Sequence, residues 1–268
     1  MPVRSSIQLS RSRVRLTTRS PMTNPLIARL RLLSSLSEDD LQILEAACTG
    51  PQTVPAHSDI QAEGRGTEHI HIVQSGWAAR YRLLRDGRRQ FPALLIPGDL
   101  CDIDALLLNR THFGVVALTS CTISVLPHAR LREIMESRPA IRDVFWWLTF
   151  VENAISAEWT VGLGARSAEE RLAHLFCELL VRLATVEMTD GNSYALPLTQ
   201  DQLSDAVGLS AVHLNRTLQD LRGSGLISLD GHRLTIHNWE ALKDFSDFSA
   251  DYLHVEGLRS GENRRAAH

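Results

Sequence analysis

The spacing of apolar residues changes along the chain and separates helical from extended regions. From Pro25 to about Cys48, apolar residues recur at the intervals of short amphipathic helices, and Ser37 precedes an acidic turn as an N-cap does. Between Gln52 and Pro127 the pattern becomes that of short strands separated by glycine-containing turns. Strands this short and this evenly punctuated predict a small barrel or roll.

Helical spacing returns in 129–137 and in a longer helix from about Pro139 to Val161. One apolar stripe of the longer helix has intervals of four, three and four, as in a seam between two helices. The core face of a single chain explains such a stripe equally well, but the position of this helix between two domains favours a dimer seam. We expect Gly162 and Gly164 to break the helix and form a hinge. The predicted seam residues are Val144, Leu148, Val151 and Ile155.

The most specific pattern begins at Leu198 and predicts a helix-turn-helix. Thr199 and Gln202 have the spacing of a capping box at the start of a first helix. Gly208 then permits a chain reversal that residues with a Cβ atom resist, and Ser210 caps a second helix. Two short helices joined by a tight turn are the expected result, and a loop over 189–197 precedes them.

A β-hairpin is predicted directly after the second helix. Residues 225–236 alternate apolar and polar side chains around Asp230-Gly231, which is a hairpin turn sequence, and His232 and Arg233 lie near its tip. Helix, turn, helix and hairpin wing in this order form a DNA-binding module.

The outward side of the second helix carries side chains that can read bases. Arginine pairs bidentately with guanine, asparagine and glutamine pair with adenine, and histidine donates to a base acceptor. We expect base contacts, with Arg216 the most important, from His213, Asn215, Arg216 and Gln219. Polar residues at the two helix starts, within the second helix and on the wing are expected to bind phosphates. These are Thr199, Gln200, Ser210, Thr217 and Arg233. Ordinary solvated polar side chains are the alternative, and the hairpin wing weakens it.

From about Pro25 to Trp239 the chain resembles the Crp/Fnr superfamily of bacterial regulators. The motifs that carry the resemblance are 198–203, 208–210, 212–218, 221–227, 97–100 and 168–172. It implies an α+β fold with an N-terminal cyclic-nucleotide-binding-like sensory β-roll, a long dimerisation helix and a C-terminal winged helix-turn-helix. The expected boundaries are 1–22 for a disordered basic head or a start site placed too early, 25–138 for the roll, 139–163 for the helix, 164–238 for the DNA-binding domain and 239–268 for a C-terminal tail.

The sequence departs from the superfamily pattern in three places. The glutamate that many members place in the first turn of the reading helix is replaced by Val212, so the operator preference is expected to differ. The Gly-Glu pair and the Arg-Ser/Thr-Ala motif of cyclic-nucleotide binders are absent, because Pro97-Gly98-Asp99-Leu100 is followed by Cys101-Asp102-Ile103-Asp104, and Arg110 precedes no Ser/Thr-Ala. A phosphate without a positioned cation would be costly to bury. The closely spaced N-terminal cysteines of an iron-sulfur regulator are missing as well.

Composition refines this interpretation. The chain has 268 residues, which suffices for two modest domains, and its apolar runs are too short to span a bilayer. Its net charge is −3, and the acid-free, arginine-rich head leaves the remainder more acidic still, so DNA affinity must come from local charge and from dimerisation. Sequence motifs of hydrolases, P-loop enzymes, dinucleotide enzymes and zinc proteases are absent.

The sequence therefore predicts a cytoplasmic, non-enzymatic transcription regulator. Its expected partners are double-stranded DNA with a palindromic operator, a second copy of the chain in a homodimer, and RNA polymerase. No cofactor is predicted, and the effector is left open. The alternatives are a cyclic-nucleotide-responsive regulator with a divergent pocket and a partner-binding module that has lost DNA binding.

Cysteines and histidines give a weaker signal. The four cysteines are far apart in sequence and are expected to be buried reduced thiols: Cys48, Cys101, Cys121 and Cys177. Cys101 near Asp99 and Asp102 could form a redox switch, but neighbouring acids raise a thiol pKa and favour an inert residue. His69 and His71 share one face of a strand, and surface or core histidines are favoured there over a metal or haem site.

Overall fold

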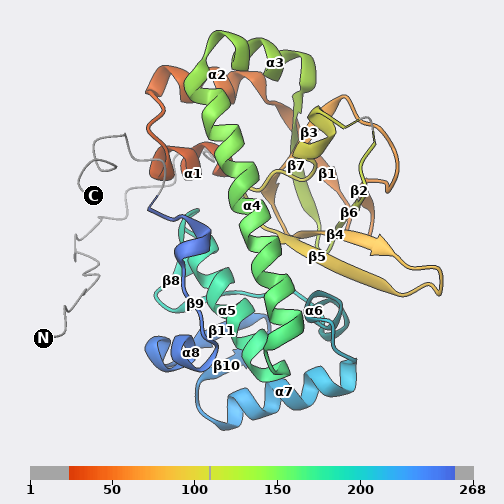
Figure 1. Cartoon of the computed structure of the whole chain (residues 1–268), viewed down its shortest axis with the longest axis vertical. Helices are drawn as coiled ribbons and strands as arrows, with labels where there is room; N and C mark the ends of the chain where they lie inside the picture. Colours follow the sequence, from red (N-terminus) through yellow and green to blue (C-terminus); the bar gives the residue numbers. More distant parts are fainter. Residues whose placement is uncertain (1–23, 109, 257–268) are drawn as a thin grey trace, which may run out of the picture.

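The computed structural model of the chain describes residues 24–108 and 110–256, and the predicted basic head lies outside this part. A β-roll covered by helices is followed by the long helix α4 and by a smaller unit of helices and a sheet (Figure 1). Within the described residues, none of the helices combines the length and the apolar character needed to cross a membrane. The predicted α+β fold is confirmed.

The β-roll consists of two sheets in which neighbouring strands are antiparallel. Their strand orders are β1-β7-β3 and β2-β6-β4-β5. Small and branched side chains fill the space between the sheets, among them Val73, Val115 and Ile123. The strands are β1 Thr49–Val54, β2 Asp59–Gln61, β3 His69–Ser75, β4 Ala78–Leu83, β5 Arg89–Leu95, β6 Gly114–Ala117 and β7 Cys121–Pro127.

Helices α1 Pro25–Leu33, α2 Glu38–Ala47 and α3 His128–Ser137 pack with the start of α4 against β3 and β7. The side chain of Ser37 accepts a hydrogen bond from the Asp40 N–H at 3.1 Å, and the Asp40 carboxylate accepts one from the Ser37 N–H at 3.2 Å. The predicted N-cap is therefore present as a full capping box.

Helix α4 extends from Pro139 to Ala165, so the predicted break at Gly162 and Gly164 is wrong. The Gly162 carbonyl still accepts a hydrogen bond from the Arg166 N–H at 3.3 Å. A glycine costs a helix about 1 kcal/mol relative to alanine. That cost does not end a helix of 27 residues that is held by packing against both parts of the chain.

The C-terminal unit surrounds α5, Ala168–Ala184, which begins with a capping box formed by Ser167 and Glu170. The predicted helices and wing strands all form. They are α6 Gln200–Val207, α7 Ala211–Gly223, β10 Ile227–Asp230 and β11 Arg233–Ile236, and α8 Trp239–Phe245 follows.

The segment predicted as a loop before α6 contains a second hairpin, β8 Thr189–Asp190 and β9 Ser193–Ala195, which extends the wing into the sheet β10-β11-β9-β8. Tyr194 anchors it: its ring is buried, and its hydroxyl donates to the Phe176 carbonyl at 3.0 Å. Strands of two and three residues leave no measurable alternation. Asp190-Gly191 was the available turn signal, and Gly191 has a φ of +57°.

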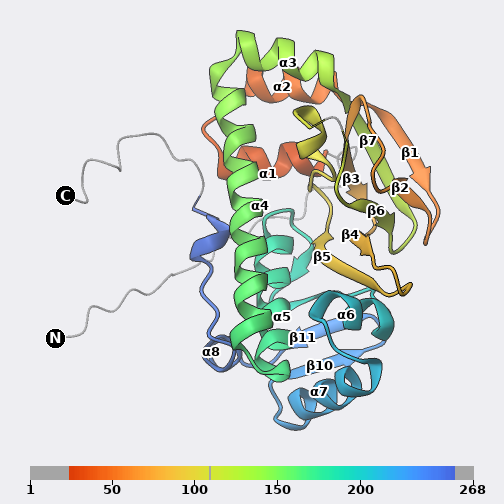
Figure 2. The ribbon, with the colours of Figure 1, turned by 45° about the vertical axis from the view of Figure 1, so that its right-hand side comes forward.

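Contacts beyond the chain connection itself join the C-terminal unit to the rest of the chain. Figure 2 shows the β4–β5 hairpin beside α6, where the Gln90 amide donates to the Asp205 carbonyl at 2.8 Å. Residues 246–256, called here the C-terminal strap, return from α8 to α4 and include the 3-10 turn Asp251–Leu253 (Figure 1). Part of the predicted C-terminal tail is therefore an ordered packing element.

The strap is held by an aromatic cluster and by a buried carboxylate. Tyr252 stacks on His174 with ring centroids 5.8 Å apart, and Phe248 meets the same ring edge-on at 5.1 Å. Burial lowers the pKa of His174 to about 4, so these rings pack against a neutral imidazole. The Tyr252 hydroxyl donates to the fully buried Glu178 at 3.0 Å.

Candidate DNA-binding interface

Local hydrogen bonds fix the first helix of the motif and its turn. Thr199 Oγ1 accepts from the Gln202 N–H at 3.2 Å, and Gln202 Oε1 accepts from the Thr199 N–H at 2.9 Å. Gly208 ends α6 in the left-handed region, with a φ of +67°, and its N–H donates to the Ser204 carbonyl at 2.8 Å. The capping box and the glycine turn predicted from the sequence are confirmed.

The second helix is oriented by its buried face. Ser210 Oγ accepts from the His213 N–H at 3.2 Å, which caps α7. Leu214, Leu218 and Leu221 are buried and seat the helix on the core of the C-terminal unit. The opposite face is consequently exposed, and α7 lies at the end of the molecule farthest from α2 and α3 (Figure 1).

All four residues predicted to read bases lie on this exposed face: His213, Asn215, Arg216 and Gln219. The Arg216 side chain is 81% exposed, and its Nε lies 3.9 Å from a carboxylate oxygen of Asp220, which is also exposed. Such a solvated pair contributes little. The Arg216 guanidinium is therefore available to an external acceptor.

The residues predicted to bind phosphates divide into two groups. Thr199, Gln200, Ser210 and Arg233 are exposed, and Arg233 forms an ion pair with Asp190 at 2.9 Å. Thr217 has no exposed surface, and its hydroxyl donates to the His213 carbonyl at 3.0 Å, one helical turn earlier. The prediction of a phosphate contact for Thr217 is wrong, because three residues after Leu214 the helix again faces the core.

The wing has regular hairpin geometry. Ile227 pairs with Ile236 and Asp230 with Arg233, and Gly231 at the turn has a φ of +60°. His232 at the tip is exposed. An exposed polar helix face, two capped helix starts and an exposed hairpin tip thus belong to one unit.

Both parts of the chain match known protein families. Residues 51–138 match the family model described as a cyclic nucleotide-binding domain, and residues 170–245 match the one described as a Crp-like helix-turn-helix domain. The nitrogen fixation regulation protein FixK of Azorhizobium caulinodans is 28% identical over 188 residues, which are 70% of this chain and 75% of that protein. The chain belongs to the Crp/Fnr family.

Other Crp/Fnr relatives give the same result. The regulatory protein HlyX of Actinobacillus pleuropneumoniae is 28% identical over 217 residues, 81% of this chain and 90% of HlyX. The solved structure of FixK2 from Bradyrhizobium japonicum is similar in fold, with a TM-score of 0.67 and 22% identity over 76% of this chain and 99% of FixK2. This Crp/Fnr chain is a DNA-binding transcription regulator.

The dimer seam predicted on α4 lies against the chain itself. Val144 is 2% exposed and belongs to the core of the roll, and Leu148 packs against the same core. Val151 and Ile155 line a cavity together with Leu253 of the strap. The prediction that Val144 belongs to a dimer seam is therefore wrong, because its side chain is buried in the core of its own chain. Spacing of three and four residues identifies a covered helix face, but it does not say whether the cover is the same chain or a second one.

A different stripe of α4 faces outward. Phe150 is 65% exposed and Trp146 is 45% exposed, and their stacked rings have centroids 6.2 Å apart. The stripe continues at intervals of three and four residues through Asn153, Ala157 and Thr160, all exposed.

A cavity of about 320 Å³ lies between the roll and α4. Arg80 of β4 points into it, donates from Nε to the Cys101 carbonyl at 2.8 Å and forms an ion pair with Glu152 of α4. The sequence analysis missed both residues. An arginine within the otherwise buried stretch from Trp77 to Tyr81 was the available signal.

The charge in this cavity does not suit a cyclic nucleotide. Three carboxylates line the same cavity as Arg80, those of Asp102, Asp104 and Glu152. Burial lowers the pKa of Arg80, and Asp104 and Asp102 oppose that change. The positive charge of the Arg80 guanidinium is therefore already balanced by carboxylates and is not available to a phosphodiester.

The histidine and cysteine beside this cavity have structural partners. His71 Nδ1 lies 2.6 Å from an Asp102 carboxylate oxygen. Burial and the neighbouring Asp102 raise the pKa of Cys101 well above its ordinary value, which favours the inert thiol. The described residues contain no cluster of histidine, cysteine or carboxylate side chains that could hold a metal ion.

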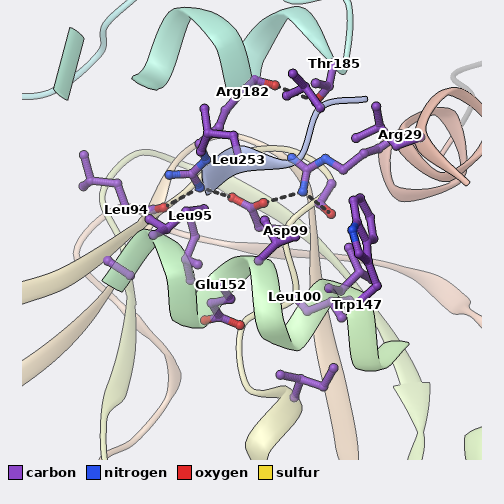
Figure 3. Close-up of a pocket in the computed structure, with 18 of the residues that line it drawn as sticks. Arg29, Leu94, Leu95, Asp99, Leu100, Trp147, Glu152, Arg182, Thr185 and Leu253 are labelled. Carbon is purple, nitrogen blue, oxygen red and sulfur yellow. Dashed lines mark hydrogen bonds and ion pairs between the residues drawn. The ribbon is translucent and has the colours of Figure 1, made fainter. Parts of the chain in front are cut away.

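Asp99 of the Pro97-Gly98-Asp99-Leu100 motif joins the two parts of the chain. Figure 3 shows Arg29 of α1 and Arg182 of α5 both pointing at its carboxylate, with contacts of 2.6 and 2.8 Å. Burial alone would raise the pKa of Asp99, but the two arginines outweigh it and hold the pKa below its usual value. Arg182 also pairs with the buried Glu178 at 2.8 Å.

Proposed function

We propose that the chain acts as a homodimer that reads a palindromic operator through the exposed face of α7. The observation that carries this proposal is the arrangement of α7: three leucines seat it on the core, and the side chains opposite them can pair with bases. In this role Arg216 pairs with guanine, and Asn215, Gln219 and His213 contact neighbouring bases. Thr199, Gln200, Ser210 and Arg233 bind the flanking phosphates.

Dimerisation is assigned to the outward stripe of α4 that contains Trp146 and Phe150. Pairing this face with its copy buries aromatic surface that water now contacts. It also holds two reading helices in the fixed relation that a palindrome needs, with half-sites separated by about 34 Å, one turn of DNA. Since the described part of the chain is not strongly basic, two linked heads supply affinity that one head lacks.

The cavity between the roll and α4 is our candidate effector pocket. Its size is at the lower end of the range for small-molecule sites, which is about 300–1,000 Å³. A ligand there would compete with the Arg80–Glu152 ion pair and so act on α4, which leads to the DNA-binding unit. We place this regulator in the cytoplasm and take RNA polymerase as the partner through which it affects transcription.

Cyclic-nucleotide control through a divergent pocket is the second candidate. The guanidinium of Arg80 in the cavity lining is in its favour. The three carboxylates around Arg80 oppose it, so we expect cyclic AMP and cyclic GMP at millimolar concentration to leave the thermal unfolding midpoint unchanged. A concentration-dependent rise in that midpoint would favour the second candidate over the first.

Binding to fragments of genomic DNA, measured by electrophoretic mobility shift, tests the function. The full-length chain should retain specific fragments, and Arg216→Ala should weaken their binding by about tenfold to a hundredfold for each half-site, as expected for a lost bidentate base contact, and the two losses multiply in the dimer. Arg130→Ala is the matched control, because Arg130 is an exposed arginine on α3, in the roll. Absence of specific binding by the parent chain, or unaltered binding by Arg216→Ala, would refute the proposal.

A further inference from the structure

Val212 is an apolar residue in the first turn of the reading helix, and it is the most exposed large hydrophobic side chain among residues 24–108 and 110–256. Its exposure is 83%. It follows Ser210, the cap of α7, by two positions. Leucines on the other face anchor α7 to the core, so the packing of the chain itself does not account for Val212.

A valine at this place has no local advantage. A β-branched side chain loses rotamer freedom in a helix, and an exposed polar residue would be solvated better. Val212 shares its helix face with Arg216 and Gln219, which follow at four and seven residues. Whatever surface Arg216 approaches, Val212 approaches as well.

In the major groove, an aliphatic side chain makes its favourable base contact with the C5-methyl group of thymine. We propose that Val212 reads a thymine methyl group in each half-site. Four residues of helix rise by about 6 Å, and base pairs are about 3.4 Å apart, so this thymine lies within about two base pairs of the guanine paired with Arg216. The inference rests on the proposed function and identifies one base of each operator half-site.

The test begins with duplexes selected from a random library by the full-length chain. Each thymine of the enriched sequence is replaced by deoxyuridine, symmetrically in both half-sites, which removes only a methyl group. At one position we expect affinity to fall about fourfold per half-site, or about sixteenfold in all, as for the loss of one buried methyl group. The other thymines serve as internal controls.

Two variants connect that position to Val212. Val212→Ala removes the two γ-methyl groups of the side chain and should therefore remove most of the difference in affinity between the thymine and deoxyuridine duplexes. Val212→Glu should prefer cytosine in place of this thymine, because a carboxylate accepts a hydrogen bond from the cytosine amino group. The inference is wrong, although the proposed function stands, if replacing thymine by deoxyuridine lowers the affinity at no position. It is equally wrong if the loss of affinity is as large in Val212→Ala as in the parent chain. If the library yields no enriched sequence at all, the proposed function itself has failed.

Discussion

Replacing Asp99 by asparagine should destabilise the whole fold, because one carboxylate compensates two arginines from different parts of the chain. Asp99 accepts from Arg29 at 2.6 Å, from Arg182 at 2.8 Å and from the Ile96 N–H at 2.7 Å. Removing one partner of a buried ion pair costs about 3–5 kcal/mol. Arg182 keeps Glu178, so we expect the lower end, about 3 kcal/mol.

Urea denaturation followed by circular dichroism measures this effect. With a slope of about 3 kcal/mol/M, the unfolding midpoint of Asp99→Asn should fall by about 1 M. Asp86→Asn is the matched control, because Asp86 pairs with Arg88 in the exposed turn between β4 and β5 and should change stability by less than about 1 kcal/mol. Equal effects of the two substitutions would refute the role assigned to Asp99.

The same pair of proteins has a defined pH dependence. Since the folded-state pKa of Asp99 is lowered, its carboxylate stabilises the fold above the unfolded-state pKa of about 3.9, and this stabilisation is lost as the pH falls through the folded-state value. The difference in unfolding free energy between the parent chain and Asp99→Asn should therefore narrow below about pH 4. A difference that stays constant down to pH 2 would contradict this explanation.

Three further substitutions test other parts of the structure. Thr217→Val should leave DNA affinity within about twofold in a fluorescence anisotropy assay, because the Thr217 hydroxyl donates to the His213 carbonyl and is not free to bind a phosphate. A loss of affinity above about fivefold would show that Thr217 contacts a phosphate after all. Phe150→Asp should give a monomer in light scattering, since each buried phenylalanine contributes about 1.5–3 kcal/mol, whereas an unchanged dimer would place the seam elsewhere. Tyr252→Phe should lower the unfolding free energy by about 1.5–3 kcal/mol by removing a hydrogen bond to the buried Glu178 carboxylate, and no change would mean that this bond contributes nothing.

The features that the sequence predicted correctly are local. The N-cap at Ser37, the capping box at Thr199 and the turn at Gly208 depend on residues no more than four positions apart, and those residues determine their own backbone geometry. The exposed reading face followed from the same local pattern, because capping and leucine spacing together set the orientation of α7. Thr217 was the exception on α7, because the sequence does not distinguish a single polar residue on the buried face of a helix from its exposed polar neighbours.

Features that depend on contacts between distant segments were missed. Asp99 meets Arg29 and Arg182 across separations of 70 and 83 residues, and no spacing rule relates them. Arg80 and Glu152 pair between a strand and a helix for the same reason. The apolar stripe through Val151 was recognised, but its cover, the strap, has no periodicity of its own from which its docking could be predicted.

The strap limits how the DNA-binding unit can move relative to α4. The chain connects the two covalently where α4 passes into α5 at Arg166, and the strap connects them a second time where its Asp251–Leu253 turn contacts α4. Once the contacts that Gln90 and Asp99 make with this unit are broken, the two remaining attachments leave it one easy rotation, about the line through both points. While the strap stays docked, each DNA-binding unit of a dimer would rotate about this single axis and not in all directions. A signal would then select between positions along one arc.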